Sequence, residues 1–153
     1  MRLTTRTNLA MRVLMFCAVN TDRIVRSAEI AAGCNASPNH LAQVVHLLSV
    51  NGFVATTRGR SGGLQLGRPA QEIMIGEVFR TFEAGLPFAE CFAGEENTCP
   101  LTAACRLRGI LARAVEAFYR ELDRVTLQEL VADNHDLSVI FAMRPEIRLP
   151  CGA

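Results

Sequence analysis

Hydrophobic residues recur at helical spacing through the first half of the chain. Near its start, Leu9, Val13 and Phe16 fall on one side of a helix, with Thr7 placed to cap the first turn. The polar residues 20–22 give this helix a natural end. The pattern therefore predicts a one-sided helix that packs against a core.

Two further helices are predicted next. Ser27 opens a short helix that ends at Gly33, and after a turn Ser37 caps a longer helix with Pro38 in its first position. Gly52 marks the end of this third helix. Its apolar residues share one face: Leu41, Val44, Val45 and Leu48. Two helices joined by a short turn, the second one capped and one-sided, form the helix-turn-helix pattern.

The opposite face of the third helix is polar. Its side chains can hydrogen-bond to base edges or phosphates, and they are Asn39, His40, Gln43 and His46, with Ser37 at the capping position. A polar outer face is also typical of any solvated helix. The face by itself therefore leaves DNA binding open.

Two short strands are predicted after this helix, at residues 53–57 and 63–66. The tip between them holds Arg58 and Arg60 among glycines that tolerate positive φ. Guanidinium groups are attracted into a narrow minor groove of DNA. We therefore interpret the hairpin as the wing of a winged helix, with Arg58 and Arg60 as groove-binding candidates. An ordinary polar hairpin is the alternative.

The net charge of +1 hides a division between two parts of the chain. Residues 1–68 carry eight arginines against two acids, a balance of +6. Residues 69–153 carry eight arginines against thirteen acids, a balance of −5. This asymmetry favours an N-terminal region that faces nucleic acid, joined to a region that does not.

The second half of the chain is typical of an assembly element. Apolar residues within 72–83 predict a short amphipathic helix that connects to the winged region. Thr126 with Glu129 predicts a capping box for a later helix, and the hydrophobic stretch 137–141 is placed to pack on a partner. A long apolar face lies between the helix within 72–83 and the one that Thr126 caps. Its residues are Leu107, Ile110, Leu111, Ala114, Val115, Phe118 and Leu122. Because such a face is too one-sided to leave bare, we expect it to pair with its twin in a homodimer.

Three cysteines precede the long helix. Cys91, Cys99 and Cys105 are separated by seven and then five residues. Thiolates are soft ligands that bind iron strongly. The spacing is neither the paired C-x-x-C of zinc sites nor the dense run of a ferredoxin. We interpret the stretch as a metal-cluster loop, with unrelated thiols or a disulfide as the alternative, and expect Cys17, Cys34 and Cys151 to be small buried or terminal thiols.

Composition excludes some classes of protein. Half of the residues are hydrophobic, yet no apolar run is long enough to cross a membrane, and Arg12 interrupts the apolar start that resembles a signal peptide. We therefore expect a cytoplasmic protein without a membrane partner. The sequence shows no nucleophile–base pairing and no phosphate-binding loop, so we do not expect an enzyme.

These patterns together predict a mainly α fold with a small two-stranded wing, in which a winged helix-turn-helix is followed by a long dimerisation helix. The expected boundaries are a DNA-binding domain at 1–68, a connecting helix at 69–90, a cluster-binding loop at 91–105, a dimerisation helix with a C-terminal helix at 106–142, and a tail at 143–153.

Three stretches of the chain carry a resemblance to a known family. They are MRLTTRTNLAMR at the start, HLAQVVHLLSVNGFVATTRGRSGGLQLGRP through the third helix and wing, and ECF with NTCPLTAACRLR before the long helix. Residues 1–142 thereby resemble the bacterial iron–sulfur winged-helix repressors that include IscR, RirA and NsrR. The resemblance implies a homodimeric regulator of double-stranded operator DNA. It also implies an iron–sulfur cluster, of the 4Fe-4S or 2Fe-2S type, between the long helix of one subunit and the N-terminal helix of the other.

By that resemblance, Cys91, Cys99 and Cys105 match the three cysteine ligands of the family. The histidine that IscR-like members place shortly after the third cysteine is absent here, because residues 106–108 are Arg-Leu-Arg. The aspartate that some NsrR-like members use in the first helix corresponds to Asn8. An uncharged amide is a poor iron ligand, so Asn8 is a candidate for a weak fourth ligand.

The resemblance leaves two signals open. The sequence of the third helix and the CRLR after the last cysteine favour the nitric-oxide-sensing NsrR branch, whereas the first cysteine gap and Asn8 are equally typical of the iron-responsive RirA branch. We expect nitric oxide to be the signal, through nitrosylation or loss of the cluster. A zinc-stabilised DNA-binding module is a further alternative, in which the thiols hold a structural ion.

Overall fold

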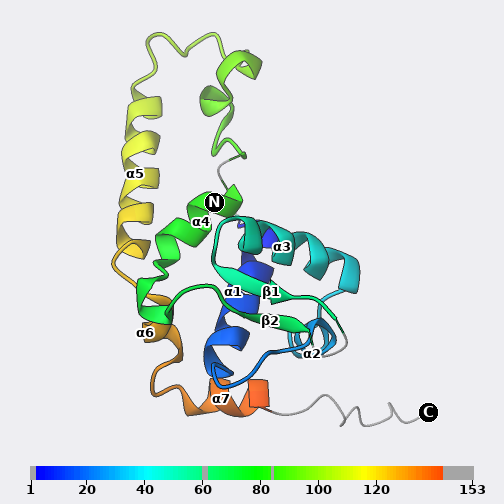
Figure 1. Cartoon of the computed structure of the whole chain (residues 1–153). Coiled ribbons are helices and arrows are strands. Elements are labelled where there is room, and N and C mark those ends of the chain that lie inside the picture. The colour runs from blue at the N-terminus through cyan, green and yellow to red at the C-terminus, as the bar shows by residue number, and fades with distance from the viewer. Residues whose placement is uncertain (1–2, 60–61, 84, 143–153) are drawn as a thin grey trace, which may run out of the picture.

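The computed structural model describes residues 3–59, 62–83 and 85–142 (Figure 1). Arg60 and the tail 143–153, which carries Cys151, lie outside these ranges. The helices are α1 (Thr5–Val19), α2 (Ser27–Gly33), α3 (Pro38–Val50), α4 (Ile75–Glu83), α5 (Arg106–Leu122), α6 (Leu127–Val131) and α7 (His135–Ala142). The two strands are β1 (Val54–Thr57) and β2 (Gly63–Leu66), and short 3-10 turns occupy Ala70–Glu72, Glu90–Phe92 and Gly94–Glu96. The architecture is mainly α with a two-stranded wing, as the sequence predicts.

The start of α1 differs from the prediction. Thr4 is the capping residue, and its hydroxyl accepts a hydrogen bond from the Thr7 backbone N–H at 3.2 Å. Thr7 lies inside the helix, fully buried, and donates its hydroxyl to Glu83 Oε1 at the end of α4. The sequence-based choice of Thr7 was wrong because a distant carboxylate satisfies its hydroxyl. Thr4 is thereby free to cap the helix one turn earlier.

The helix-turn-helix forms as predicted. Ser37 caps α3 by accepting a hydrogen bond from the His40 backbone N–H at 3.3 Å, and Pro38 occupies the first helical position. Gly52 follows the helix with φ of +72°, a left-handed conformation that glycine adopts without strain. Leu41, Val44 and Leu48 are buried against α1, and Val45 is half-buried beside them: the apolar stripe is the inner face of α3.

The wing is a regular antiparallel pair. Val54 lies opposite Leu66 and Thr57 lies opposite Gly63. Leu64 is buried and exchanges two backbone hydrogen bonds with Val25, at 2.8 and 2.7 Å. The wing is therefore hydrogen-bonded to the segment that precedes α2.

The region beyond α4 is built differently. Figure 1 shows the segment after α4 running away from α1–α3 and the wing, with α5 returning alongside it. No residue of α5 is fully buried. Thr126 and Glu129 form the predicted capping box at the start of α6. The chain then returns to the winged region through α6, whose Leu127 is fully buried.

The hydrophobic residues at the end of α7 are partly buried and partly exposed. Phe141 is buried and its ring lies 5.0 Å from the ring of Phe16 in α1, so this residue packs within its own chain rather than on a partner. Val139 and Ile140 are 44% and 58% exposed. No helix in the described part of the chain is long and apolar enough to cross a membrane.

Candidate DNA-binding face and cysteine loop

The predicted base-reading residues share the outer side of α3. Asn39, Gln43 and His46 are exposed, whereas His40 is half-buried near the start of the helix. Ser37 is exposed at the cap, with its hydroxyl already accepting from the α3 backbone. The inner stripe anchors the helix to α1, so the polar side chains are carried on a rigid element.

The wing tip presents its arginine on a tight turn. Arg58 is exposed and is followed by Gly59 with φ of +110°, a conformation that side chains disfavour. A Cβ added at Gly62 would lie 2.1 Å from the Thr57 carbonyl oxygen. Both glycines are therefore required by the turn that carries Arg58. Arg60, the other predicted groove residue, lies outside the described residues.

Asn8 lies beside the turn that leads into α3. A small cavity of about 160 Å³ is lined by Asn8, Arg12, Ser37 and His40, among others. The Arg12 guanidinium, one helical turn beyond Asn8, donates a hydrogen bond to the Cys34 carbonyl at 3.2 Å. None of the three loop cysteines lines this cavity. Arg12 was not among the site residues predicted from the sequence, although its position four residues after Asn8 places both on one side of α1.

Side-chain hydrogen bonds fold the cysteine loop back on itself. Glu90 Oε1 accepts hydrogen bonds from the backbone N–H and the hydroxyl of Thr98, at 3.2 and 2.6 Å. Because Glu90 precedes Cys91 and Thr98 precedes Cys99, this contact draws the first two cysteine segments together. The amide of Asn97 accepts from the Cys99 backbone N–H at 3.1 Å and tightens the second segment.

The third cysteine opens the long helix. Cys105 is the capping residue of α5, and its side chain makes no capping hydrogen bond. The free N–H groups of a first helical turn favour negative charge nearby, which suits a thiolate or an anionic cluster. The sequence places Cys105 before the helix, but only the structure places it at the cap.

The three loop cysteines are free thiols, each half-buried. Within the described residues, the structure does not gather three or more potential ligands into a metal-binding group. Three thiols on a connector stabilised by its own hydrogen bonds have the donor chemistry that an iron–sulfur cluster takes. The residues present therefore fit such a group in kind, and Cys91 and Cys99 are already brought toward each other by their neighbours.

The remaining described cysteines belong to the core. Burial raises the pKa of Cys17 to about 12 and that of Cys34 to about 11, although Arg12 partly offsets the effect at Cys34. Thiols held in the neutral form are poor nucleophiles and poor metal ligands. The prediction that these two are small buried thiols is confirmed.

The sequence did not predict a contact between α4 and the end of α5, which is called the joint below. Arg80 forms a double ion pair with Asp123, with Nη2 to Oδ2 at 2.8 Å, and its guanidinium lies 4.6 Å from the centroid of the Tyr119 ring. Gly76 faces this pair, and a Cβ there would lie 2.0 Å from Asp123 Oδ1. Because Arg80 and Asp123 are 43 residues apart in sequence, no local pattern indicates the contact.

Comparison with known proteins finds a family whose model matches most of the chain. The model of a family described as Rrf2, iron-dependent transcriptional regulator, matches residues 3–133. The chain is 41% identical over 145 residues to the HTH-type transcriptional regulator NsrR of Geobacillus kaustophilus, covering 94% of this chain and 99% of that protein.

Solved structures share the architecture. CymR, the global cysteine regulator of B. subtilis, superposes with a TM-score of 0.67 at 25% identity, covering 86% of this chain and 96% of that one. IscR of T. potens superposes with a TM-score of 0.67 at 21% identity, covering 87% and 88%, and at that identity it shows the fold alone. The predicted winged helix-turn-helix fold is confirmed.

Proposed function

This chain belongs to the Rrf2 family of transcriptional regulators and is not an enzyme, and on that premise we propose that it is a homodimeric repressor whose iron–sulfur cluster couples nitric oxide to release of operator DNA. The observation that carries the proposal is the set of three free, half-buried thiols on the hydrogen-bonded connector that enters α5. That connector joins a basic helix-turn-helix region to an exposed apolar helix.

DNA contact is assigned to α3 and the wing. Asn39, Gln43 and His46 project from a helix anchored by its opposite face, which is the geometry of a recognition helix entering the major groove. Arg58 at the wing tip would then reach the neighbouring backbone or minor groove. In this arrangement Ser37 and His40, near the N-terminus of α3, lie where phosphates bind.

Dimerisation is assigned to α5. Leu107 and Ile110 are 57% and 52% exposed, on a helix with no fully buried residue. Pairing with a second copy would cover this face and set two recognition helices at a fixed separation, as two DNA half-sites require.

Cys91, Cys99 and Cys105 are the residues that would hold the cluster. When bound, an iron–sulfur cluster supplies iron atoms that nitric oxide ligates strongly. If Asn8 of a second copy served as the fourth ligand, its uncharged amide would be a weak donor and would leave that iron accessible. Bound to such a group, the three thiolates would hold the loop closed, and their release would free the segment between α4 and α5.

Contacts within the chain connect the surroundings of Asn8 with the residues at the start of α3. Asn8 and Arg12 lie on one side of α1, and Arg12 donates to the Cys34 carbonyl in the turn before α3. Ser37 and His40 line the same small cavity. A change in what Asn8 contacts therefore acts on the residues that position the start of α3.

The test is purification without oxygen, followed by iron and sulfide analysis, an absorbance spectrum and a gel-shift titration with and without a nitric oxide donor. We expect a coloured protein whose DNA affinity falls about a hundredfold on nitrosylation, equivalent to about 2.7 kcal/mol. Cys91→Ser is expected to be colourless and to bind DNA as weakly as the nitrosylated protein. Cys151→Ser, which changes a cysteine outside the loop, is the matched control.

Other outcomes decide between the alternatives. A colourless Cys91→Ser protein that binds DNA as tightly as the unchanged chain would show that the loop does not control the DNA face. Loss of DNA binding on iron chelation, with no response to nitric oxide, would identify an iron-responsive regulator. Zinc without sulfide would identify a zinc-stabilised module.

A further inference from the structure

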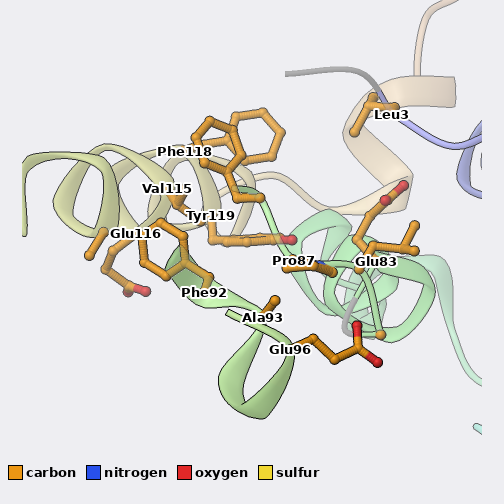
Figure 2. Close-up of a pocket in the computed structure, with 14 residues that line it drawn as sticks. Leu3, Glu83, Pro87, Phe92, Ala93, Glu96, Val115, Glu116, Phe118 and Tyr119 are labelled. Carbon is orange, nitrogen blue, oxygen red and sulfur yellow. The ribbon is translucent and has the colours of Figure 1, made fainter. Parts of the chain in front are cut away.

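A large cavity lies on one side of α5. It measures about 860 Å³, is partly open to solvent, and is bordered by Leu3, the end of α4, the segment 85–96 and the middle of α5 (Figure 2). Its size is that of a site for a small organic molecule, roughly 300–1,000 Å³. Aromatic rings dominate the lining: Phe88, Phe92, Phe118 and Tyr119.

The charge of the lining has one sign. Among the fourteen residues that line the cavity, Glu83, Glu96 and Glu116 are acidic and none is basic. Figure 2 shows the hydroxyl end of Tyr119 directed toward Pro87 and Glu83. Aromatic faces and carboxylates both attract cations, whereas they repel anions. An occupant with a positive charge and an apolar body would match both parts of the lining.

A contact between a cation and an aromatic ring already lies next to the cavity. The Arg80 guanidinium lies over the Tyr119 ring, 4.6 Å from its centroid, and is paired with Asp123. Arg80 is thereby committed to Asp123, which lies outside the lining, and leaves the three glutamates of the cavity without a basic counterpart among its lining residues.

The cavity and the exposed part of the apolar face lie on neighbouring sides of α5, and two residues of the predicted apolar face, Val115 and Phe118, line the cavity. Leu107, Ile110 and Ala114 follow one another at helical spacing on the exposed apolar side. Ala112, Glu116 and Tyr119 form a separate row that faces the cavity. Pairing of α5 with its twin through the first row leaves the second row open.

We propose that this cavity binds a small organic cation with an aromatic or aliphatic body and an ammonium or guanidinium group. The body contacts Phe92, Phe118 and the free side of Tyr119, and the charged group lies at the rim of the cavity, where Glu116 at one end and Glu96 at the other are exposed carboxylates. Because Phe92 directly follows Cys91, an occupied cavity holds the segment that carries the first loop thiol. The chain thus has a place for an effector that is separate from its DNA-binding face.

The test uses the composition of the chain. Tyr119 is the one tyrosine, and there is no tryptophan, so intrinsic tyrosine fluorescence of the full-length apo protein reports on this cavity alone. Phenethylamine is the cationic probe, and phenethyl alcohol and phenylacetate are its neutral and anionic counterparts. We expect a saturable change with the amine, binding of the alcohol about tenfold weaker, and none with phenylacetate. Calorimetry repeats the titration on anaerobically purified protein.

Two variants test the carboxylates. Glu116→Gln and Glu96→Gln are each expected to weaken amine binding several-fold and to leave alcohol binding unchanged. Glu121→Gln is the matched control, because Glu121 is on the same helix, exposed, paired with Arg124 and outside the cavity. Equal binding of amine and alcohol, unchanged affinity in both glutamine variants, or no saturable binding of the amine would each overturn the proposal. None of these readouts depends on iron or DNA.

Discussion

The winged region and α5 are folded by different means. In α1, eight of fifteen residues are buried, and the apolar sides of α3 and the wing close over them. In α5, none of seventeen residues is buried, although its apolar residues gather on one side more strongly than those of α1. A helix of this length is marginal by itself in water and takes most of its stability from packing. The winged region therefore carries its own core, whereas α5 buries none of its residues within the described part of its own chain.

The two regions meet at a small contact. Arg80 in α4 joins Asp123 after α5, and Phe79 packs against Phe118 with ring centroids 6.2 Å apart. Hydrogen bonds donated by the Arg80 guanidinium lower the pKa of the Asp123 carboxyl. The contact ties α5 to α4, and Glu83 at the end of α4 accepts a hydrogen bond from the Thr4 backbone N–H at 3.0 Å, which ties α4 to the start of α1.

The largest effect is expected from removal of a core ring. Phe53 is fully buried at the base of the wing, so Phe53→Ala should cost about 3–5 kcal/mol of unfolding free energy. Leu107→Ala, at an exposed position of α5, should change the stability of the monomer by less than about 0.5 kcal/mol. Urea unfolding followed by circular dichroism at low protein concentration measures both. Equal losses would mean that α5 shares the core of the winged region.

A smaller effect is expected at the joint. The hydrogen of Gly76 faces Asp123, and the Cβ of Gly76→Ala would lie 2.9 Å from the Asp123 backbone nitrogen as well as against its carboxylate. Relief of this overlap requires α4 and α5 to separate, at a cost of about 1–3 kcal/mol. Gly85→Ala is the control, because nothing lies within 4 Å of a Cβ at Gly85. Thermal unfolding of both variants compares them.

The apolar face of α5 is tested through assembly. Leu107→Asp introduces a charge at an exposed apolar position of the proposed dimer contact, and we expect a monomer with unchanged helical content. Arg113→Asp, on the same helix but off this face, should remain dimeric. Sedimentation equilibrium gives the mass. A dimeric Leu107→Asp protein would show that the partner, if any, covers another surface.

The smallest effect concerns pH. Burial alone would raise the pKa of Glu83, but hydrogen bonds from Thr7 and Thr4 outweigh it, so its pKa lies below the ordinary 4.5. Since the folded state binds this proton less readily than the unfolded state, ionised Glu83 stabilises the fold above about pH 4.5. The contribution disappears as the pH falls through the lower folded-state pKa.

Glu83→Gln should therefore flatten the acid side of the stability profile below pH 4.5. Glu95→Gln, an exposed loop carboxylate, is the matched control. Stability curves collected between neutral and acidic pH provide the measurement, and identical profiles for the two variants would rule out the hydrogen-bonded role of Glu83.

Local chemistry explains what the sequence predicted well. Ser37 with Pro38, Gly52, and the box of Thr126 with Glu129 each satisfy backbone groups within a few residues, so the pattern and the structure agree. The cap of α1 was mistaken, because Glu83 is 76 residues from Thr7 and no local pattern reveals it. Phe141 was assigned to a partner for the same reason: its contact, Phe16, is at the other end of the chain.

The sequence by itself determined the periodic elements, the basic N-terminal region and the three thiols before a one-sided helix. Each of these is written in residue type and spacing, which act over a turn or two of chain. Only the tertiary structure decided which apolar faces find partners, that Glu90 draws two cysteine segments together, and that acids and aromatic rings from three segments line one cavity. Those features depend on contacts between distant residues, where long-range packing rather than local propensity sets the free energy.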